Sequence, residues 1–444
     1  MGKQPAGIRS LTLHWQFALH GLPLLLVLLI GAPAEAQQQA SGQEQSAAVQ
    51  DPAHAKVADT SVDEPTKDLF DLLRQLLHKP PPPPPEAGAA TTRMIAAAPV
   101  ISYNPTSGVG FGAAGNIAYY DGSPDTTRIS SVVASLIGTS KKQVLINAKV
   151  NSWARDNRWH IQGDNRFYWT SQKTYGLGSD SPESAAVDQK YDAFRVYETV
   201  YRPVARDTYL GAGFLYNIHR NVQPADDGAT EAWQDSPYVT YSEQHGFDPA
   251  SQTSAGLTVR TLFDTRDNPI NPGRGWYANA GYLMFFNGFL GGTSSWQQLS
   301  YDVRRYLRIS RNARHKLALW FTGDFITGGT APYLDLPATG MDTYGRSGRG
   351  YPQGRFRGEE LVYGEAEYRW TATRNGLFGM VAFVNTETLS SKQENKDLFD
   401  SFATGAGFGF RLMLNKRSKT NLCFDIGFGK EGSRAAYFGV QEAF

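Results

Sequence analysis

A glycine-flanked arginine in a long connection is the sequence feature best suited to a specific polar contact. The segment Gly348-Arg349-Gly350-Tyr351 is followed by a second arginine-rich segment, residues 354–358. The glycines permit tight backbone turns, and a guanidinium offers a fork of N–H donors that fits a carboxylate. A flexible solvated loop is the simpler interpretation, but it predicts fewer aromatic residues than this segment contains. We therefore expect Arg349, Gly350 and Tyr351 to form a contact site.

A second polar cluster closes a predicted strand. Asp264, Arg266 and Asp267 are followed by Pro269 and Gly273. Proline cannot donate to a strand ladder, and glycine lets the chain reverse its direction. A well-formed turn explains the proline and the glycine, but it does not explain the three charged residues together. We interpret these five residues as a turn motif with a role beyond chain reversal.

The sequence lacks the common patterns of catalytic, cofactor and metal sites. Gly345-Arg346-Ser347-Gly348-Arg349 begins like a nucleophile elbow, but it lacks the final glycine and does not join a strand to a helix. No zinc-protease motif, phosphate-binding loop, dinucleotide fingerprint or Cys/His cluster is found. The single cysteine, Cys423, cannot form an internal disulfide. We expect a protein that is not an enzyme and has no cofactor; a barrel hydrolase with Ser and His in its wall is the alternative.

Composition adds one exclusion about partners. The formal net charge of +1 gives no electrostatic argument for binding nucleic acid or a strongly acidic partner.

The N-terminus has the pattern of an export signal. Lys3 and Arg9 precede an apolar run at residues 22–30, and small residues follow up to Ala36. The apolar run is well short of the roughly 20 residues that span a bilayer. A cleaved signal peptide over residues 1–36 is therefore favoured over a retained anchor helix.

Residues 37–92 have the composition of a low-complexity linker, and we interpret this linker as periplasmic. A run of prolines at residues 80–85 must be extended. Before it, leucines at helical spacing predict a short amphipathic helix over residues 66–78. This helix is either marginal by itself, or it lies on the membrane, docks on the barrel or pairs with a partner.

Residues 93–444 consist of short segments in which polar and apolar residues alternate between turn signals. The alternation is clearest at residues 143–152, 316–326, 361–370 and 401–415. After the export signal no apolar run is long enough for a membrane helix, and the mean hydropathy is −0.40, which excludes a helical membrane protein. The segments number about sixteen with roughly ten residues each, the length of a tilted membrane strand. We predict an all-β fold, a transmembrane antiparallel β-barrel whose charged side chains face the lumen.

The lengths of the connections support this interpretation. If both ends of the barrel are periplasmic, the longest connections, near residues 172–188, 225–248 and 330–358, all lie outside. Long outside and short inside connections are typical of outer-membrane barrels. A soluble β-sandwich or propeller is the alternative, and it is disfavoured because no blade-length repeat is visible.

The two motifs and the C-terminal segment 435–444, which ends in Phe444, occur in the same order in the barrels of the BamA/TamA-type bacterial surface-antigen family. The chain resembles this family over about residues 95–444, most strongly from Asp264 onward. The resemblance implies a bacterial outer-membrane location, a long loop folded into the lumen, and a Phe444 insertion signal that the barrel-assembly machinery recognises. Family members that assemble or secrete proteins carry POTRA modules. The linker leaves no room for one, so a short member without POTRA domains is expected.

The resemblance also implies a partner for the loop arginine. In the family this arginine contacts an acidic residue of an F-x-D-x-G motif on the following wall, and the matching segment here is Phe383-Val384-Asn385-Thr386-Glu387. Because Asn replaces the acidic residue, the partner of Arg349 is left open. Asn385 and Glu387 share one face of their strand, and Glu365 and Glu367 point inward by the alternation. We favour Glu367 or Glu387 as the anion.

The function implied by the resemblance is assembly or translocation. The barrel would act on protein or lipid clients through a lateral seam between its first and last strands and through the arginine-bearing loop, since an open seam exposes strand edges that can pair with a client. The alternative is a passive channel or structural barrel in which the loop only braces the lumen. Expected partners are outer-membrane lipid, the barrel-assembly machinery during insertion, and a periplasmic or self partner at the 66–78 helix.

Overall fold

The computed structural model describes residues 65–80, 93–104, 108–154, 156–225, 230–310 and 313–444. The predicted signal peptide at residues 1–36 lies outside the described residues, as does the linker apart from residues 65–80. The helices are α2 (Leu69–Leu76), α3 (Thr230–Gln234) and α4 (Pro237–Gln244). The strands are β1 (Met94–Asn104), β2 (Gly108–Tyr119), β3 (Ser130–Thr139), β4 (Val144–Ala154), β5 (Trp159–Thr174), β6 (Val187–Ala205), β7 (Thr208–Pro224), β8 (Ser251–Asp264), β9 (Gly275–Phe285), β10 (Trp296–Arg308), β11 (His315–Gly329), β12 (Glu360–Thr371), β13 (Phe378–Leu389), β14 (Ala403–Asn415), β15 (Thr420–Phe428) and β16 (Arg434–Val440).

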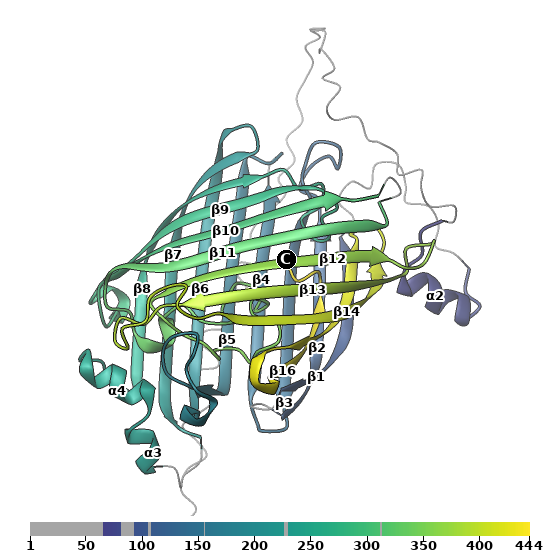
Figure 1. Ribbon diagram of the computed structural model, residues 1–444. Helices are drawn as coiled ribbons and strands as arrows, with labels where there is room; N and C mark the ends of the chain where they lie inside the picture. The colour runs from purple at the N-terminus through teal and green to yellow at the C-terminus, as the bar shows by residue number, and fades with distance from the viewer. Residues whose placement is uncertain (1–64, 81–92, 105–107, 155, 226–229, 311–312) are drawn as a thin grey trace, which may run out of the picture. The chain divides into compact units, whose positions relative to one another are not determined.

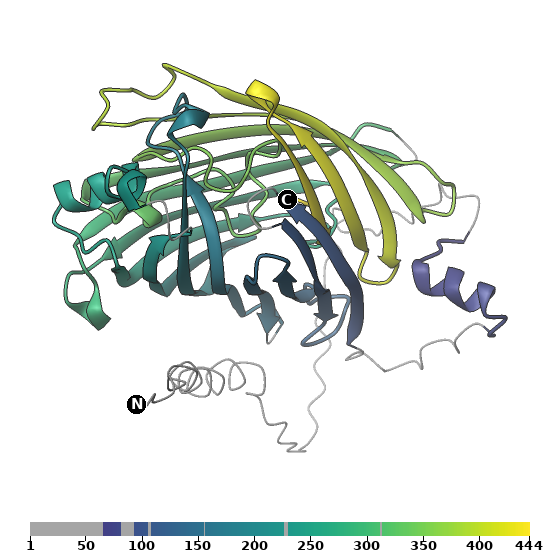
Figure 2. The same ribbon diagram turned by 90° about the horizontal axis from the view of Figure 1, so that it is seen from below.

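The sixteen strands form a single antiparallel sheet in which each strand pairs with its neighbours in chain order. The sheet curls round into a nearly closed barrel (Figures 1 and 2). The predicted fold class and strand number are therefore confirmed. In the described part of the chain, no helix is long and apolar enough to cross a membrane.

Side chains alternate between the lumen and the outer surface, as the sequence predicts. In β12, Glu365, Glu367 and Arg369 are buried, whereas Tyr368 and Trp370 are exposed on the other face. The apolar residues that would face lipid are thus outside, and the charged residues are inside. This arrangement avoids a charge on the lipid face, which would cost about 2–4 kcal/mol near the midplane of the bilayer.

The two rims of the barrel differ in the length of their connections. Turns at one rim are short, as between β6 and β7 and between β14 and β15, whereas connections at the other rim include residues 225–250 and 330–359. Helices α3 and α4 lie at the long-connection rim, on the opposite side of Figure 1 from α2. The short-turn rim is the one that the sequence analysis expects to be periplasmic. The sequence analysis did not predict α3 and α4, although the Ser236 N-cap with Pro237 at the first helical position is a helix-start signal.

The strands vary more in length than the predicted ten residues. β16 has 7 residues, and β6 has 19. The β5–β6 ladder continues to Thr174 and Val187, whereas β4 pairs with β5 only as far as Trp169. The β5–β6 hairpin therefore extends beyond its neighbour at the outer rim, because its pairing continues past the end of β4.

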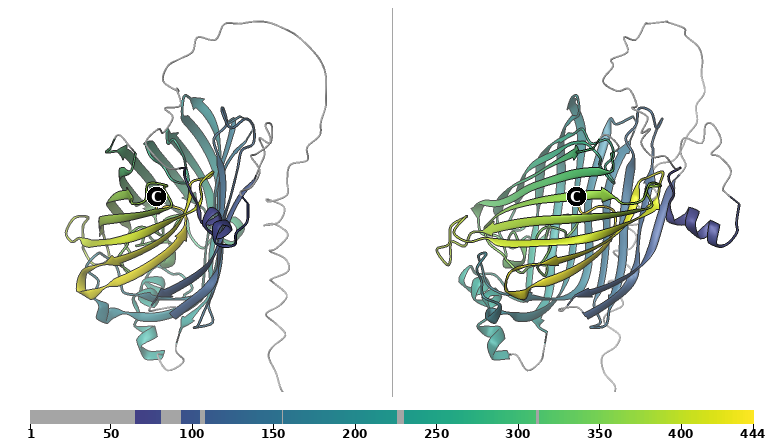
Figure 3. Two further views of the ribbon diagram at one scale, coloured as in Figure 1. Left: turned by 90° about the vertical axis from the view of Figure 1, so that its right-hand side faces the viewer. Right: turned by 45° about the vertical axis from the view of Figure 1, so that its right-hand side comes forward.

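The first and last strands meet without a backbone ladder. β1 and β16 lie next to each other (Figure 3), but across the described residues the pairing runs only from β1 through to β16 and does not close the ring. Instead, their contact is made by apolar side chains. The cluster at this seam includes residues of β1, β14 and β16, namely Ala96, Ala98, Val100, Leu414 and Val440.

The seam is an overlap of the two sheet edges. The clustered β1 residues alternate with exposed Ile95 and Ile101, so they lie on the lumen face of β1. Leu414 shares the outer face of β14 with exposed Phe408 and Phe410. The Tyr437 side chain points to the lumen, where it contacts the loop. Val440 lies three residues later in the same strand, so its side chain points to the outer face. The lumen face of β1 therefore packs against the outer face of the C-terminal strands.

The C-terminal residues turn into the lumen and do not end the last strand as expected. β16 ends at Val440, and Gln441 has a φ of 128°, which takes the chain out of the sheet. The buried ring of Phe444 lies 5.1 Å from the ring of Trp320, and Arg369 donates a hydrogen bond to the Phe444 backbone oxygen at 3.0 Å. Phe444 is therefore held inside the barrel by an aromatic contact and by a hydrogen bond from Arg369.

Candidate functional site

The long connection 330–359 between β11 and β12 folds into the lumen, and glycines shape its tip. Gly348 and Gly350 flank Arg349 and have φ values of 69° and 125°. A Cβ atom on Gly350 would lie 2.9 Å from the backbone of Phe428. Only glycine therefore fits both the conformation and the space at this position.

The Arg349 side chain is completely buried and faces three carboxylates. Its Nη2 contacts Glu365 and Glu367 of β12, and its Nη1 lies 2.9 Å from Oδ2 of Asp425 in β15. The guanidinium carbon lies 3.7 Å from the centre of the Phe383 ring. Several carboxylates and an aromatic face are an environment that a planar guanidinium fits and a lysine does not.

Two more arginines and a fourth carboxylate extend this cluster. Arg369 Nε lies 2.6 Å from Oε1 of Glu367, and Arg411 lies 2.5 Å from Oδ1 of Asp425 and 2.8 Å from Oε2 of Glu442. A buried ion-pair network contributes little net stability, but removal of one partner costs about 3–5 kcal/mol because it leaves a buried charge unpaired. The network therefore fixes where the loop lies more than it stabilises the barrel.

The structure separates the four predicted partners of Arg349. Glu365 and Glu367 contact its guanidinium. Asn385 donates from Nδ2 to the main-chain oxygen of Arg349 at 2.9 Å. The Glu387 carboxylate instead accepts a hydrogen bond from a loop hydroxyl at 2.7 Å. Among these four residues, the two on β12 contact the Arg349 side chain, and Asn385 on β13 contacts the Arg349 backbone.

The sequence analysis missed Asp425 as a partner. The residue alternates along β15 with the outward Phe424 and Ile426, and it is buried on the lumen face. An acidic residue at a lumen position of a C-terminal strand was the available signal. Alternation gives the face of a strand, but it does not say which lumen residues meet a loop from elsewhere in the chain.

The loop tip also holds the last strand from the lumen side. The Tyr437 hydroxyl donates to the backbone oxygen of Tyr351 at 2.9 Å and accepts from the Gly350 N–H at 3.2 Å. Arg346 donates to the backbone oxygen of Phe438 at 2.9 Å. Tyr351, which was predicted as part of the contact site, therefore contacts β16 through its backbone oxygen. The position of β16 depends on these side-chain contacts as well as on its ladder with β15.

The base of the loop is attached to the opposite wall. Arg166 in β5 donates to the backbone oxygen of Asp342 at 2.7 Å and forms a two-point contact with Asp164 at 2.7 and 2.8 Å. Ser347, the serine of the incomplete elbow motif, donates to Asp342 Oδ1 at 2.8 Å. This serine holds a turn of the loop. The loop as a whole spans the lumen from β5 to β16.

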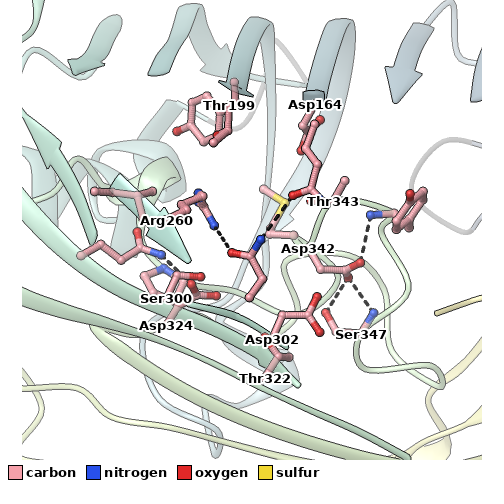
Figure 4. Close-up of a pocket in the computed structure, with 18 of the residues that line it drawn as sticks. Asp164, Thr199, Arg260, Ser300, Asp302, Thr322, Asp324, Asp342, Thr343 and Ser347 are labelled. Atoms are coloured by element: carbon pink, nitrogen blue, oxygen red, sulfur yellow. Dashed lines mark hydrogen bonds between the residues drawn. The ribbon is translucent and has the colours of Figure 1, made fainter. Parts of the chain in front are cut away.

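A polar cavity lies between the loop and the wall formed by β4 to β11 (Figure 4). The labelled side chains that line it are Asp164, Thr199, Arg260, Ser300, Asp302, Thr322, Asp324, Asp342, Thr343 and Ser347. Both charge signs are present, which is ordinary for a barrel lumen. Over the described ranges, no group of three or more His, Cys, Asp or Glu side chains is arranged to hold a metal ion.

The Asp264 turn motif forms a second polar cluster, at the short-turn rim. Buried Asp264 lies 2.8 Å from Nη2 of Arg266 and 3.6 Å from Nη1 of Arg128, and Arg128 also lies 2.7 Å from Asp207. Burial disfavours the charge of Arg266, but the neighbouring Asp264 carboxylate outweighs this effect and raises the pKa of the arginine. These contacts join the turns after β2, β6 and β8.

The remaining motif residues shape the same turn. Asp267 Oδ1 accepts from the Gly273 N–H at 2.8 Å, and Asp267 Oδ2 lies 3.1 Å from Arg308 Nη2 in β10. The Pro269 oxygen accepts from Gln441 Nε2 at 3.4 Å. The motif thus links neighbouring turns to the segment that follows β16, and its charged residues have a structural explanation.

Comparisons with known proteins identify related barrels. Residues 216–429 match the model of the Omp85 superfamily domain. The structure of BamA from Haemophilus ducreyi lacking POTRA domains 1–3 aligns at 14% identity with a TM-score of 0.49, covering 78% of this chain and 69% of that one. CdiB from Acinetobacter baumannii aligns at 13% identity with a TM-score of 0.49, covering 78% of this chain and 59%, less than two thirds, of the other. None of the curated proteins matches the sequence.

Proposed function

The chain is an outer-membrane β-barrel with an Omp85 superfamily domain, and we propose that it acts on protein or lipid clients through the seam between β1 and β16. The observation that carries this proposal is the missing ladder between these two strands in the described residues. Every other pair of neighbouring strands forms an antiparallel ladder.

The physical basis is the cost of separating strands in lipid. An unpaired backbone N–H or C=O group in the bilayer core costs several kcal/mol, so a laddered pair resists opening. The β1–β16 contact is made by apolar side chains, whose exposure to lipid tails costs far less than their exposure to water. An edge strand with free backbone groups is also a template onto which a client strand can be added.

The lumen loop has a defined part in this proposal. Arg349 and Arg346 attach the loop to β12, β15 and the backbone of β16. The loop then determines how far β16 tilts toward the lumen, and therefore how much of its edge is covered by β1. Clients that engage the seam would compete with these contacts.

The other parts of the chain are assigned as follows under the same proposal. Residues 1–36 are removed on export, residues 37–92 form a periplasmic linker, and residues 93–444 form the barrel. The barrel-assembly machinery inserts the protein by recognising the segment that ends in Phe444. The activity is assembly or translocation without catalysis, cofactor or metal.

A peptide-capture experiment tests the seam directly. The probe is a synthetic peptide of residues 434–444 with a photoreactive group, added to the full chain in liposomes of phosphatidylethanolamine and phosphatidylglycerol. Ala98→Cys and Val440→Cys, in a Cys423→Ala background, lock the seam when oxidised. Thr261→Cys with Ala280→Cys is the matched control, because these residues face each other in the β8–β9 ladder.

The expected result is crosslinking of the peptide to β1 in the reduced seam pair and in the oxidised control. Oxidation of the seam pair should abolish it. Equal crosslinking in the oxidised seam pair, or crosslinks that lie away from β1 and β16, would contradict the proposal.

A passive channel is the competing function, and the polar cavity beside the loop favours it. Planar-bilayer conductance separates the two. Deletion of residues 340–358 removes the loop tip. If this raises conductance and leaves outer-membrane composition unchanged in cells, the loop is only a plug and the seam proposal fails. If outer-membrane composition changes, the barrel acts on clients.

A further inference from the structure

Helix α2 is attached to the periplasmic rim of the barrel. Asp68 caps its N-terminus by accepting from the Asp71 N–H at 2.9 Å. The Lys416 N–H donates to Asp68 at 3.1 Å, and the Lys67 N–H donates to the Asn375 oxygen at 3.0 Å. Both partners belong to short turns, between β14 and β15 and between β12 and β13. The helix therefore has a fixed place at the edge of the membrane-facing wall.

The start of the helix covers the outer face of the barrel. Leu69 and Phe70 pack against the seam cluster that includes Leu414. Leu414 lies at a β-bulge at the end of the row of β14 that includes exposed Phe408 and Phe410, and it is only 1% exposed. The helix thus continues the lipid-facing surface of β14 at its periplasmic edge.

The rest of the apolar face of the helix extends beyond the barrel. Leu72, Leu73, Leu76 and Leu77 have exposed fractions of 44%, 42%, 71% and 61%. Residues three and four apart lie on one face of a helix, so these leucines form a stripe with Leu69. A stripe of this size on a short helix is unfavourable in water.

Basic side chains lie around the stripe. Lys79 follows the helix, and Arg374, Arg417 and Lys419 lie in the two turns that hold it. All four side chains are exposed. Leucines on one face with cations beside them are the pattern of a helix that lies in the interface of a membrane with anionic lipids.

We propose that α2 binds the lipid surface of the periplasmic leaflet, with its leucine stripe inserted among the acyl chains beside the seam. The occupant is lipid because the stripe continues a surface of β14 that already faces the bilayer. The inference rests on the outer-membrane location of the barrel and does not depend on whether the seam opens.

The test measures the depth of a single fluorophore in the membrane. Leu76→Cys in a Cys423→Ala background is labelled with a nitrobenzoxadiazole dye, and the full chain is reconstituted in phosphatidylethanolamine and phosphatidylglycerol with or without brominated lipid. Gln75→Cys is the matched control, because residue 75 lies away from the stripe on the same turn. The dye at residue 76 should shift to the blue and be quenched by brominated lipid, and the dye at residue 75 should not.

Two outcomes would overturn the proposal. Equal, water-like emission at both positions would show that the stripe stays solvated. A disulfide between two copies of the unlabelled Leu76→Cys chain in the bilayer, together with no quenching of the labelled chain by brominated lipid, would show that a second copy covers the stripe.

A second variant avoids reliance on a single labelled site. The dye is placed at Leu72→Cys, and Leu73→Gln with Leu76→Gln removes two leucines that are not needed for the contact with Leu414. Loss of two leucines that insert into the lipid under this proposal should lower the lipid-bound fraction of the helix by about tenfold or more. Unchanged quenching of the dye in this variant would also contradict the proposal.

Discussion

The two halves of the barrel wall are held in place by different means. β6 and β7 have 19 and 17 residues and pair along almost their whole length. β16 has 7 residues, one laddered neighbour and no ladder to β1 among the described residues. Its other contacts are made by side chains. Arg346 of the loop donates to the β16 backbone, and Tyr437 of β16 donates to the backbone of the loop. The middle of the first half, at β6 and β7, is fixed by its backbone ladders, whereas the end of the second half is held in part by a loop that single substitutions can release.

Replacement of Arg349 should produce the largest difference in amide exchange between the two halves of the barrel. Arg349→Ala leaves Glu365, Glu367 and Asp425 buried without their shared arginine. The free energy of unfolding should fall by about 3–5 kcal/mol, measured by urea denaturation in detergent micelles. Amide exchange should rise in β12 to β16 and stay unchanged in β5 to β8.

Arg417→Ala is the control for this substitution, because Arg417 is an exposed arginine at the rim. It should change the unfolding free energy by less than about 0.5 kcal/mol. A similar loss in both variants, or a uniform rise in exchange around the barrel, would show that the loop does not hold one half selectively.

Gly350→Ala should displace the loop tip without removing a charge. The φ of 125° at this residue strains any other side chain, and the new Cβ would lie 2.9 Å from the backbone of Phe428. The expected cost is about 3 kcal/mol, read from the urea midpoint. Gly432→Ala is the matched control, since its φ is also positive, at 77°, but its Cβ meets open space. It should cost about 1 kcal/mol; equal effects would mean that close packing of the tip is unimportant.

The two glutamates of β12 should differ in their importance. Glu367 contacts three arginines, Arg349, Arg369 and Arg411, whereas Glu365 contacts Arg349 and the hydroxyl of Tyr363. Glu367→Gln should therefore cost about 2 kcal/mol and Glu365→Gln about 1 kcal/mol, in the same denaturation assay. The reverse order would show that Glu365 is the main anchor of the loop.

The smallest effect concerns the attachment of α2. Burial disfavours the charge of Asp71, but the hydrogen bond and charge of Lys416 outweigh it and lower the pKa of the carboxyl group. A lowered pKa means that the ion pair stabilises the docked helix at pH values above the ordinary value of 3.8 and is lost as the pH falls below it. Because Asp71 and Lys416 are both partly exposed, with 22% and 38% of their side chains accessible, solvent screens the pair and the contribution is well below about 1 kcal/mol.

The measurement is the emission of a dye at Gln75→Cys as the pH is lowered in detergent. Asp71→Asn is the control, and it should remove this part of the pH response. An identical pH response in the Asp71→Asn variant would show that another group controls the docking of the helix.

The wall of the barrel was predictable from the sequence, and the contacts inside it were predictable only in part. Alternation along residues 361–370 indicated that Glu365 and Glu367 face inward, and the glycines beside Arg349 indicated a turn that presents this side chain for a polar contact. Alternation assigns a face and not a neighbour, so it gave no reason to connect Arg349 with Asp425, 76 residues away.

The ends of the chain were harder to predict for a related reason. Phe444 fits the pattern of a last strand residue, but in the structure it leaves the sheet for the aromatic surface of Trp320 and the side chain of Arg369. The missing ladder at the seam had one local signal that the sequence analysis did not use, since Pro99 in the interior of β1 cannot donate to a ladder and is typical of an edge strand. Both features depend on how the first and last strands meet after the sheet has curled.

Amide hydrogen exchange of the full chain in lipid nanodiscs tests most directly whether the seam is the weakest line of the wall. The backbone amides of β1 and β16 are compared with those of β6 and β7 at equal depth in the membrane. We predict that β1 and β16 exchange at least tenfold faster, and that the peptide of residues 434–444 protects β1. Exchange of β1 as slow as that of β6, with no protection by the peptide, would contradict the account.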